Sequence, residues 1–256
     1  MAPDIFAQSA IAALYLVATL LLYARIGRSY AIPLALLGLL LHLVLLGVRW
    51  KNLGQIPIVT RYEDFTVDAL AVVGVYLAAQ WRLPQLRVAG LTALPLAAAG
   101  VLAALLYGRG GYHMSPSLRT NWLVAHAELN SLAIGAGTLA AGLVIARMVS
   151  TRPDRELDIL AGRLTAWAFF LWGSMVAAGS YWASLAWGRY WGWDPIESWS
   201  LATLLAYAFV LHLRHKPSFR IQTWMGMALL PYAMMLFTTY GLLMLMRSIH
   251  GQYLFQ

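Results

Sequence analysis

The chain has 256 residues, of which 61% are hydrophobic and 11% are charged, with a mean hydropathy of +0.67. Soluble domains carry about 25% charged residues, so this composition excludes an ordinary soluble protein and predicts lipid around most of the chain. The net charge of +8 does not indicate nucleic-acid binding, because the basic residues stand singly between apolar runs, and we expect no nucleic-acid partner. The chain has no cysteine, which excludes a disulfide framework and a thiol nucleophile.

Eight apolar segments are long enough to cross a bilayer, whose hydrocarbon core of about 30 Å requires about 20 helical residues. Each is predicted to be a helix, since lipid offers the backbone no hydrogen-bond partners. We therefore predict an all-α, polytopic integral membrane protein with one transmembrane domain over residues 1–256. The eight predicted spans are 5–23, 31–48, 65–81, 88–107, 122–149, 164–185, 198–213 and 223–246.

Residues 153–164 precede the sixth span and predict a short interfacial helix. Leu157, Leu160 and Leu164 recur at helical spacing, with charged residues between them. We interpret this segment as a connector lying on the membrane surface, with a partner-docking helix as the alternative.

The distribution of basic residues predicts the orientation. Eleven Lys and Arg residues fall on the side that holds the links between spans one and two, three and four, five and six, and seven and eight, against seven on the other. Because cytoplasmic segments are enriched in Lys and Arg, the first side is predicted to be cytoplasmic. We expect a bacterial-type cytoplasmic or thylakoid-like membrane, with both termini and the loop between spans six and seven outside.

That outer loop lies in the segment AWGRYWGWDPIESWSL, residues 186–201. Five of the eleven tryptophans lie between Trp182 and Trp199. An aromatic belt is the alternative interpretation, but a belt is spread over all helix ends. Gly192, between Trp191 and Trp193, favours close approach of two large rings to a flat ligand. Asp194 is expected to turn the chain, and Glu197 or Ser198 to begin the next helix.

A flat ligand that carries a metal requires axial donors, and neutral imidazole is the usual donor. His126 lies one turn after Trp122, where the fifth span begins, and His250 follows the eighth span, so both are expected at the outer side with the tryptophans. Either could be structural by itself, but together they bracket the aromatic loop. His113 and His215 lie in loops, and we predict no ligand role for them.

The segment WGRYWGWDPIESWSL resembles the WWD motif of the cytochrome c assembly family of haem-handling membrane proteins, most closely its CcsA (ResC) branch. The similarity includes Trp187, Trp191, Trp193, Asp194 and Trp199, while Ser198 replaces the usual threonine. Four further segments resemble that family: RWKNLGQIPIVTRYEDF, SPSLRTNWLVAHAELNSLA, LHLRH and SIHGQYLF.

The resemblance implies roles for individual residues. His126 and His250 would be the outer axial ligands of haem iron, and His212 would hold haem in transit through the membrane. The loop tryptophans would clamp the porphyrin, whereas Asp194 and Glu197 would orient the loop or bind a partner. Arg189 is a candidate for a haem propionate, or else a solvated loop arginine. His42, in the second span, would be a haem ligand or a buried residue bonded to a neighbouring helix.

The function that the resemblance implies is haem transport and presentation in cytochrome c biogenesis. The cargo would be non-covalently bound haem b, to be attached to an apocytochrome c that carries a Cys-x-x-Cys-His segment. The chain would be the haem-lyase (cytochrome c synthase) subunit beside a CcsB/ResB-like membrane partner, whose portion it lacks.

Three alternative functions remain open at this point. A CcmC-like haem exporter that loads a chaperone is disfavoured by eight spans and by the ending PIESWSL. A membrane b-type cytochrome that carries electrons is disfavoured because no span has two histidines about a dozen residues apart. A transporter unrelated to haem would leave the tryptophan loop unexplained.

Overall fold

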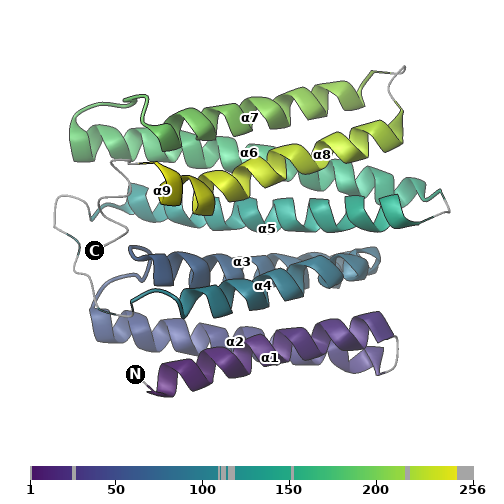
Figure 1. Ribbon diagram of the computed structural model, residues 1–256, viewed down its shortest axis with the longest axis horizontal. Helices are drawn as coiled ribbons and strands as arrows, with labels where there is room; N and C mark the ends of the chain where they lie inside the picture. The colour runs from purple at the N-terminus through teal and green to yellow at the C-terminus, as the bar shows by residue number, and fades with distance from the viewer. Residues whose placement is uncertain are drawn as a thin grey trace.

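The computed structural model describes residues 2–24, 27–108, 110, 114, 119–150, 153–216 and 220–246, and these ranges form helices and connecting turns without a strand. The helices run roughly along one axis (Figure 1). Helices α1 (Ala2–Ala24), α2 (Arg28–Leu53), α3 (Arg61–Arg82) and α4 (Gly90–Ala104) form one half of the bundle. A 3-10 turn, η1 (Pro84–Ala89), precedes α4.

The second half contains α5 (Asn121–Val149), α6 (Arg155–Trp187), α7 (Pro195–Arg214) and α8 (Ile221–Leu236). Helix α8 continues through a π-helical turn, η2 (Phe237–Gly241), into α9 (Leu242–Leu245). Helices α3 and α4 pack against α5, and these contacts join the two halves.

Six segments of the described chain are long and apolar enough to cross a membrane: Asp4–Ala24, Ser29–Leu53, Pro84–Ala104, Asn121–Val149, Arg155–Trp187 and Pro195–Arg214. They confirm the prediction of an all-α, multi-pass membrane protein. Two predicted spans are less regular. Helix α3 carries charged residues in its first turns, and α8 has 16 residues before the π-helical turn.

The structure corrects two predicted boundaries. The prediction of a separate interfacial helix at 153–164 is wrong, because α6 runs without interruption from Arg155 to Trp187. Asp154 caps this helix by accepting a hydrogen bond from the N–H of Leu157 at 3.0 Å, so the capping residue starts the span itself. Helix α7 begins at Pro195, three residues before the predicted start, since Asp194 is its N-cap.

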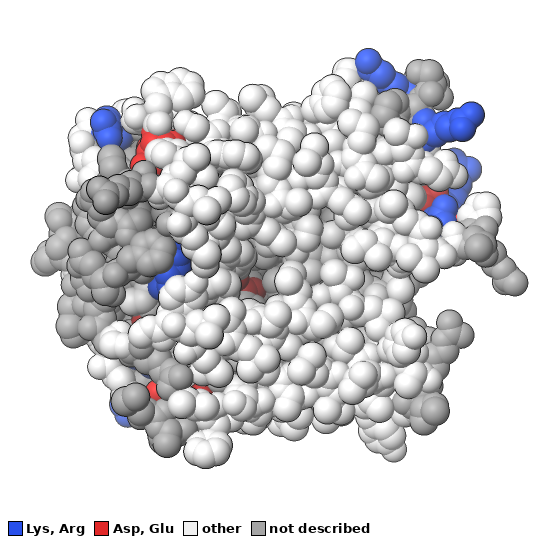
Figure 2. Space-filling view, in the orientation of Figure 1, with Lys and Arg blue, Asp and Glu red and all other residues white. Residues whose placement is uncertain are grey.

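Antiparallel neighbours bring the beginnings of α1, α3, α5 and α7 to the same end of the bundle as the ends of α2, α4, α6 and α9 (Figure 1). We call this the site end; it contains the loop between α6 and α7. Figure 2 shows charged atoms mainly at the two ends of one face, with largely uncharged surface between them. This arrangement is typical of a protein that keeps its charges outside the hydrocarbon layer.

The opposite end is held together by Asp158 of α6. Its carboxylate accepts a hydrogen bond from Arg147 Nε of α5 at 2.7 Å, and its backbone carbonyl accepts one from Arg214 Nη2 of α7 at 2.8 Å. The Arg214 guanidinium also lies over the Trp224 ring of α8, 4.5 Å from its centroid. Gly162 is required beneath it, because any side chain there would occupy the space of the guanidinium. Helices α5, α6, α7 and α8 are thus joined around Asp158.

Arg147→Ala should destabilise the protein by about 1–3 kcal/mol, because it leaves a half-buried carboxylate without its charged donor. Thermal unfolding of the detergent-solubilised protein measures this. Arg163→Ala is the matched control, since Arg163 is exposed on the same end of α6 and its loss should cost less than about 0.5 kcal/mol. Equal effects of the two substitutions would contradict the proposed joint.

Candidate functional site

The tryptophan loop is held by two acidic side chains. Helix α6 ends at Trp187, and Gly188 follows with a φ of 73° that favours glycine. Glu197 Oε2 accepts hydrogen bonds from the N–H groups of Gly192 at 2.7 Å and Asp194 at 3.1 Å. Asp194 Oδ1 accepts the N–H of Ile196 at 2.9 Å. Asp194 and Glu197 therefore form a capping box that orients the loop and starts α7.

Trp193 lies between the two amides that Glu197 binds, and it has a φ of 56°. Among the described residues it is the single non-glycine with positive φ, a conformation that costs about 1–2 kcal/mol. Trp193 is 70% exposed. Because Glu197 holds the backbone on both sides, its carboxylate keeps this large ring pointing away from the bundle.

The aromatic rings of this region meet edge to face. Trp191 and Trp193 have centroids 6.0 Å apart at 86°, and Trp182 and Trp187 have centroids 4.9 Å apart at 67°. Trp199 packs in the same way on Phe237 of η2, at 4.9 Å and 64°. These tryptophans are thus arranged in edge-to-face aromatic pairs.

Gly192 also makes room for a side chain of the loop itself. A Cβ at this position would lie 2.7 Å from Cζ of Arg189, so the missing side chain makes room for a guanidinium. Arg189 itself is exposed at the loop surface. Gly192 therefore accommodates the Arg189 guanidinium, and the two flanking tryptophan rings meet edge to face.

His126 lies in the second turn of α5 and is half buried against α6. Its Nδ1 is 2.9 Å from the backbone carbonyl oxygen of Met175. Since a carbonyl only accepts, Nδ1 carries the proton, and Nε2 is the lone-pair nitrogen of the neutral ring. The ring is also nearly parallel to Trp182, at 11° and 6.4 Å between centroids. Metal-ligating histidines almost always donate their other ring N–H to a carbonyl, a carboxylate or water, and His126 makes a contact of this kind.

A cavity of about 180 Å³ adjoins His126. It lies between α3, α5, α6, the beginning of α7 and η2. Its walls include Met175, Trp172 and Trp182 of α6, and Ile58 and Val59 from the loop before α3. Sites for drug-sized ligands usually enclose about 300–1,000 Å³, so a porphyrin would enter this cavity only in part.

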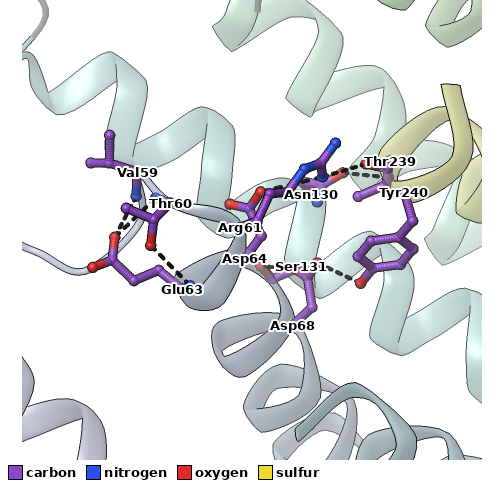
Figure 3. A network of polar contacts seen from close by, with 10 residues as sticks. All are labelled: Val59, Thr60, Arg61, Glu63, Asp64, Asp68, Asn130, Ser131, Thr239 and Tyr240. Atoms are coloured by element: carbon purple, nitrogen blue, oxygen red, sulfur yellow. Dashed lines mark hydrogen bonds and ion pairs between the residues drawn. The ribbon is translucent and has the colours of Figure 1, made fainter. Parts of the chain in front are cut away.

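The α3 wall of the cavity carries a charged network that the sequence analysis did not predict (Figure 3). Arg61 Nη1 donates to the carbonyl of Thr239 at 2.9 Å and lies 3.5 Å from Asp64 Oδ2. Asp68 accepts hydrogen bonds from Ser131 Oγ at 2.5 Å and from the Tyr240 hydroxyl at 2.6 Å. The available signal was a pair of carboxylates four residues apart, Asp64 just before the predicted third span and Asp68 within it, because ionisable groups inside membranes are usually functional.

The wall formed by Ile58 and Val59 is held by Glu63. Its carboxylate accepts the N–H groups of Val59 at 2.8 Å and Thr60 at 3.1 Å (Figure 3). It also pairs with Arg49 of α2 at 2.8 Å and is almost completely buried. Glu63 thereby fastens the segment between α2 and α3 to the site end of the bundle.

The remaining predicted histidines lie elsewhere. His42 is fully buried in α2, and its Nδ1 is 3.3 Å from the hydroxyl of Tyr15 in α1. It contacts a neighbouring helix, as one alternative expected, and does not line the cavity. His212 is exposed in the last turn of α7, at the end opposite the tryptophan loop (Figure 1). His250 and His113 lie outside the described residues.

Glu197→Ala should destabilise the loop by about 1–2 kcal/mol, because two backbone amides and the α7 capping box lose their acceptor. Hydrogen exchange at the amides of Gly192 and Asp194 should become faster. Ser198→Ala is the control, since the Ser198 hydroxyl makes only a marginal 3.5 Å contact with the Trp193 carbonyl. Unchanged hydrogen exchange at both amides in Glu197→Ala would contradict the proposed role of Glu197 in holding the loop.

Comparisons with known proteins agree with the resemblance. The cytochrome c biogenesis protein CcsA of Chlamydomonas reinhardtii is 29% identical, with 73% of this chain and 58% of that protein aligned. CcsA of Microcystis aeruginosa is 28% identical, with 66% and 71% aligned. The chain thus spans less than two thirds of the length of the first of these relatives.

The fold has a solved counterpart in the cytochrome c haem lyase CcmF, with a TM-score of 0.69 and 21% sequence identity. The similarity covers 98% of this chain and 47% of CcmF, and at this identity it concerns the fold alone. The family described as cytochrome C assembly protein matches residues 59–250, a range that includes α3, His126 and the tryptophan loop. The chain therefore belongs to the cytochrome c assembly protein family.

Proposed function

We propose that this chain binds haem b without a covalent bond at the site end of the bundle and presents it for attachment to apocytochrome c. The observation that carries this proposal is the orientation of the His126 ring beside the cavity. Its Nδ1 is bonded to the Met175 carbonyl, so the nitrogen of the neutral ring that bears the lone pair is Nε2. The ring adjoins both a cavity and Trp182 of the aromatic region.

The residues present fit a haem ligand set. Neutral imidazole is the usual axial donor to haem iron, and the contact with a carbonyl orients His126 for this role. His250 is the proposed second axial ligand, by resemblance to the family. Trp187, Trp191, Trp193 and Trp199 are the proposed apolar contacts of the porphyrin edge.

Electrostatics supports one orientation of the bound haem. The α3 wall contains Asp64 and Asp68 but one guanidinium, that of Arg61, and so disfavours anionic propionates. Arg189 is an exposed cation in the tryptophan loop. We therefore assign the propionates to the Arg189 side and an apolar edge to the cavity.

The proposed reaction takes its sulfur from the client. Each thiol of a Cys-x-x-Cys-His segment adds across a haem vinyl group, so that sulfur bonds to one vinyl carbon and hydrogen to the other. This chain contributes axial binding, orientation and exclusion of water, which together favour reaction geometry. The exposed ring of Trp193 is the proposed contact for the client or for a CcsB-like membrane partner.

Haem uptake is proposed at the other end of α7. His212 shares an exposed face with Phe209 and Leu205, which lie one and two turns before it. The distance along α7 from Pro195 to His212 is roughly 25 Å, so one haem iron would not reach His212 and His126 together. In this proposal the end with His212 is cytoplasmic, the tryptophan loop is external, and a membrane partner covers the His212 face.

His126→Ala should weaken haem retention by more than about tenfold, since even changes to groups that support a metal ligand cost that much. The absorption spectrum and pyridine haemochrome of the purified protein measure the loss. Added imidazole should restore part of the bound haem. His215→Ala is the control, because His215 is exposed beyond the last residue of α7. A colourless wild type that binds no haem on titration would overturn the proposal.

Co-expression with an apocytochrome c tests the attachment step. The synthase function expects covalent haem on the client, detected as a c-type pyridine haemochrome, and expects His126→Ala to abolish it. Haem export to a chaperone would instead leave the client without covalent haem while this chain still carries haem b.

His212→Ala should reduce the amount of haem at the outer site without changing the spectrum of the haem that arrives there. Haem supplied from the external side should bypass part of the defect. His42→Ala is a useful comparison, because His42 is buried in the other half of the bundle. Wild-type haem content and maturation in His212→Ala would contradict the uptake role.

A further inference from the structure

We infer that Gly179 is the positioning residue that holds the His126 imidazole in its ligand orientation. This inference rests on the proposed function, because it concerns the proposed axial ligand. Gly179 has no part in the WWD segment, and the sequence analysis did not single it out. Its role becomes visible only from the contact between α5 and α6.

The geometry leaves no room for a side chain. A Cβ on Gly179 would lie 2.5 Å from Nδ1 and 2.6 Å from Cε1 of His126, closer than real Cβ contacts. The three nearest atoms to that Cβ all belong to the His126 ring. The missing side chain therefore serves the imidazole, rather than general packing between the two helices.

Met175, Gly179 and Trp182 lie on one face of α6, at spacings of four and three residues. We call them the imidazole socket. The Met175 carbonyl fixes which nitrogen carries the proton, Gly179 lets the ring reach that carbonyl, and Trp182 lies nearly parallel to the ring. A larger residue at position 179 would displace the His126 ring from the Met175 carbonyl. The ring has to move, because the new side chain is attached to the backbone of a continuous helix.

The first experiment needs no haem. Gly179→Ala should lower the thermal unfolding temperature of the detergent-solubilised protein in the wild-type background. The same change in a His126→Ala background should lower it much less, because the clashing ring is gone. Gly173→Ala is the matched control on the same helix, since its Cβ would meet only the flexible end of Leu204 at 3.3 Å. An equal decrease in the unfolding temperature in both backgrounds would overturn the inference that Gly179 makes room for the His126 ring.

The second experiment measures the ligand function. Ferric haem titrated into the full chain should bind Gly179→Ala roughly 10- to 100-fold more weakly than wild type, the usual effect of losing a group that orients a metal ligand. Gly173→Ala should bind haem as wild type does. Wild-type haem affinity and an unchanged spectrum in a folded Gly179→Ala protein would overturn the inference.

Imidazole rescue keeps the test independent of the folding of Gly179→Ala. Imidazole added to His126→Ala should restore haem binding by entering the socket. The double variant His126→Ala, Gly179→Ala should require roughly 10- to 100-fold more imidazole, because a methyl group fills part of the socket. Equal rescue of the two would contradict the inference. Failure of wild type to bind haem would instead refute the proposed function, while the unfolding cycle would still test the contact.

Discussion

The bilayer offers no water to the backbone, and this constraint decides where the protein can be irregular. Inside hydrocarbon every N–H and C=O must be paired within its own helix, except where the chain lines a cavity or is buried in protein. Three irregular segments of the described chain follow this rule. The tryptophan loop, the segment before α3 and the π-helical turn η2 all lie at the site end, and the last two contribute residues to the cavity beside His126. Part of the candidate site is therefore built from places where helical pairing is interrupted, while His126 and Met175 come from the continuous helices α5 and α6.

Charged side chains at the site end take over the hydrogen bonds that these interruptions leave. Glu197 binds the amides on both sides of Trp193, and Glu63 binds those of Val59 and Thr60. Arg61 donates to the carbonyl of Thr239, in the turn where the helix changes its pattern. Each of these acids or bases spans two elements, so loss of one group would loosen a wall of the site rather than one contact. This arrangement gives rigidity to a site made of loops and helix ends.

The sequence predicted much of the architecture, because span length and apolar composition are local properties. Six of the predicted spans correspond to helices that are long and apolar enough to cross a membrane. The start of α7 was predicted three residues late, although Asp194 and Glu197 had been identified as the residues at the turn. The prediction of an interfacial helix failed for a physical reason. Leucines among charges indicate a surface helix, but Asp158 bonds to Arg147 of α5 and Arg214 of α7 and so packs this first part of α6 against the bundle.

What the sequence by itself determined is the class of protein, its resemblance to the family and the residue types near the candidate site, since each depends on composition or on neighbours along the chain. Only the tertiary structure decided which of them meet. It brings His126 of α5 to the carbonyl of Met175 and to Gly179 in α6, contacts that bridge about 50 residues of chain and that no motif records. It also brings Asp68 of α3 to Tyr240 near the end of the described chain. His42 lies away from the cavity, because the buried face of α2 that carries it packs against Tyr15 of α1, a neighbour that the local sequence does not specify.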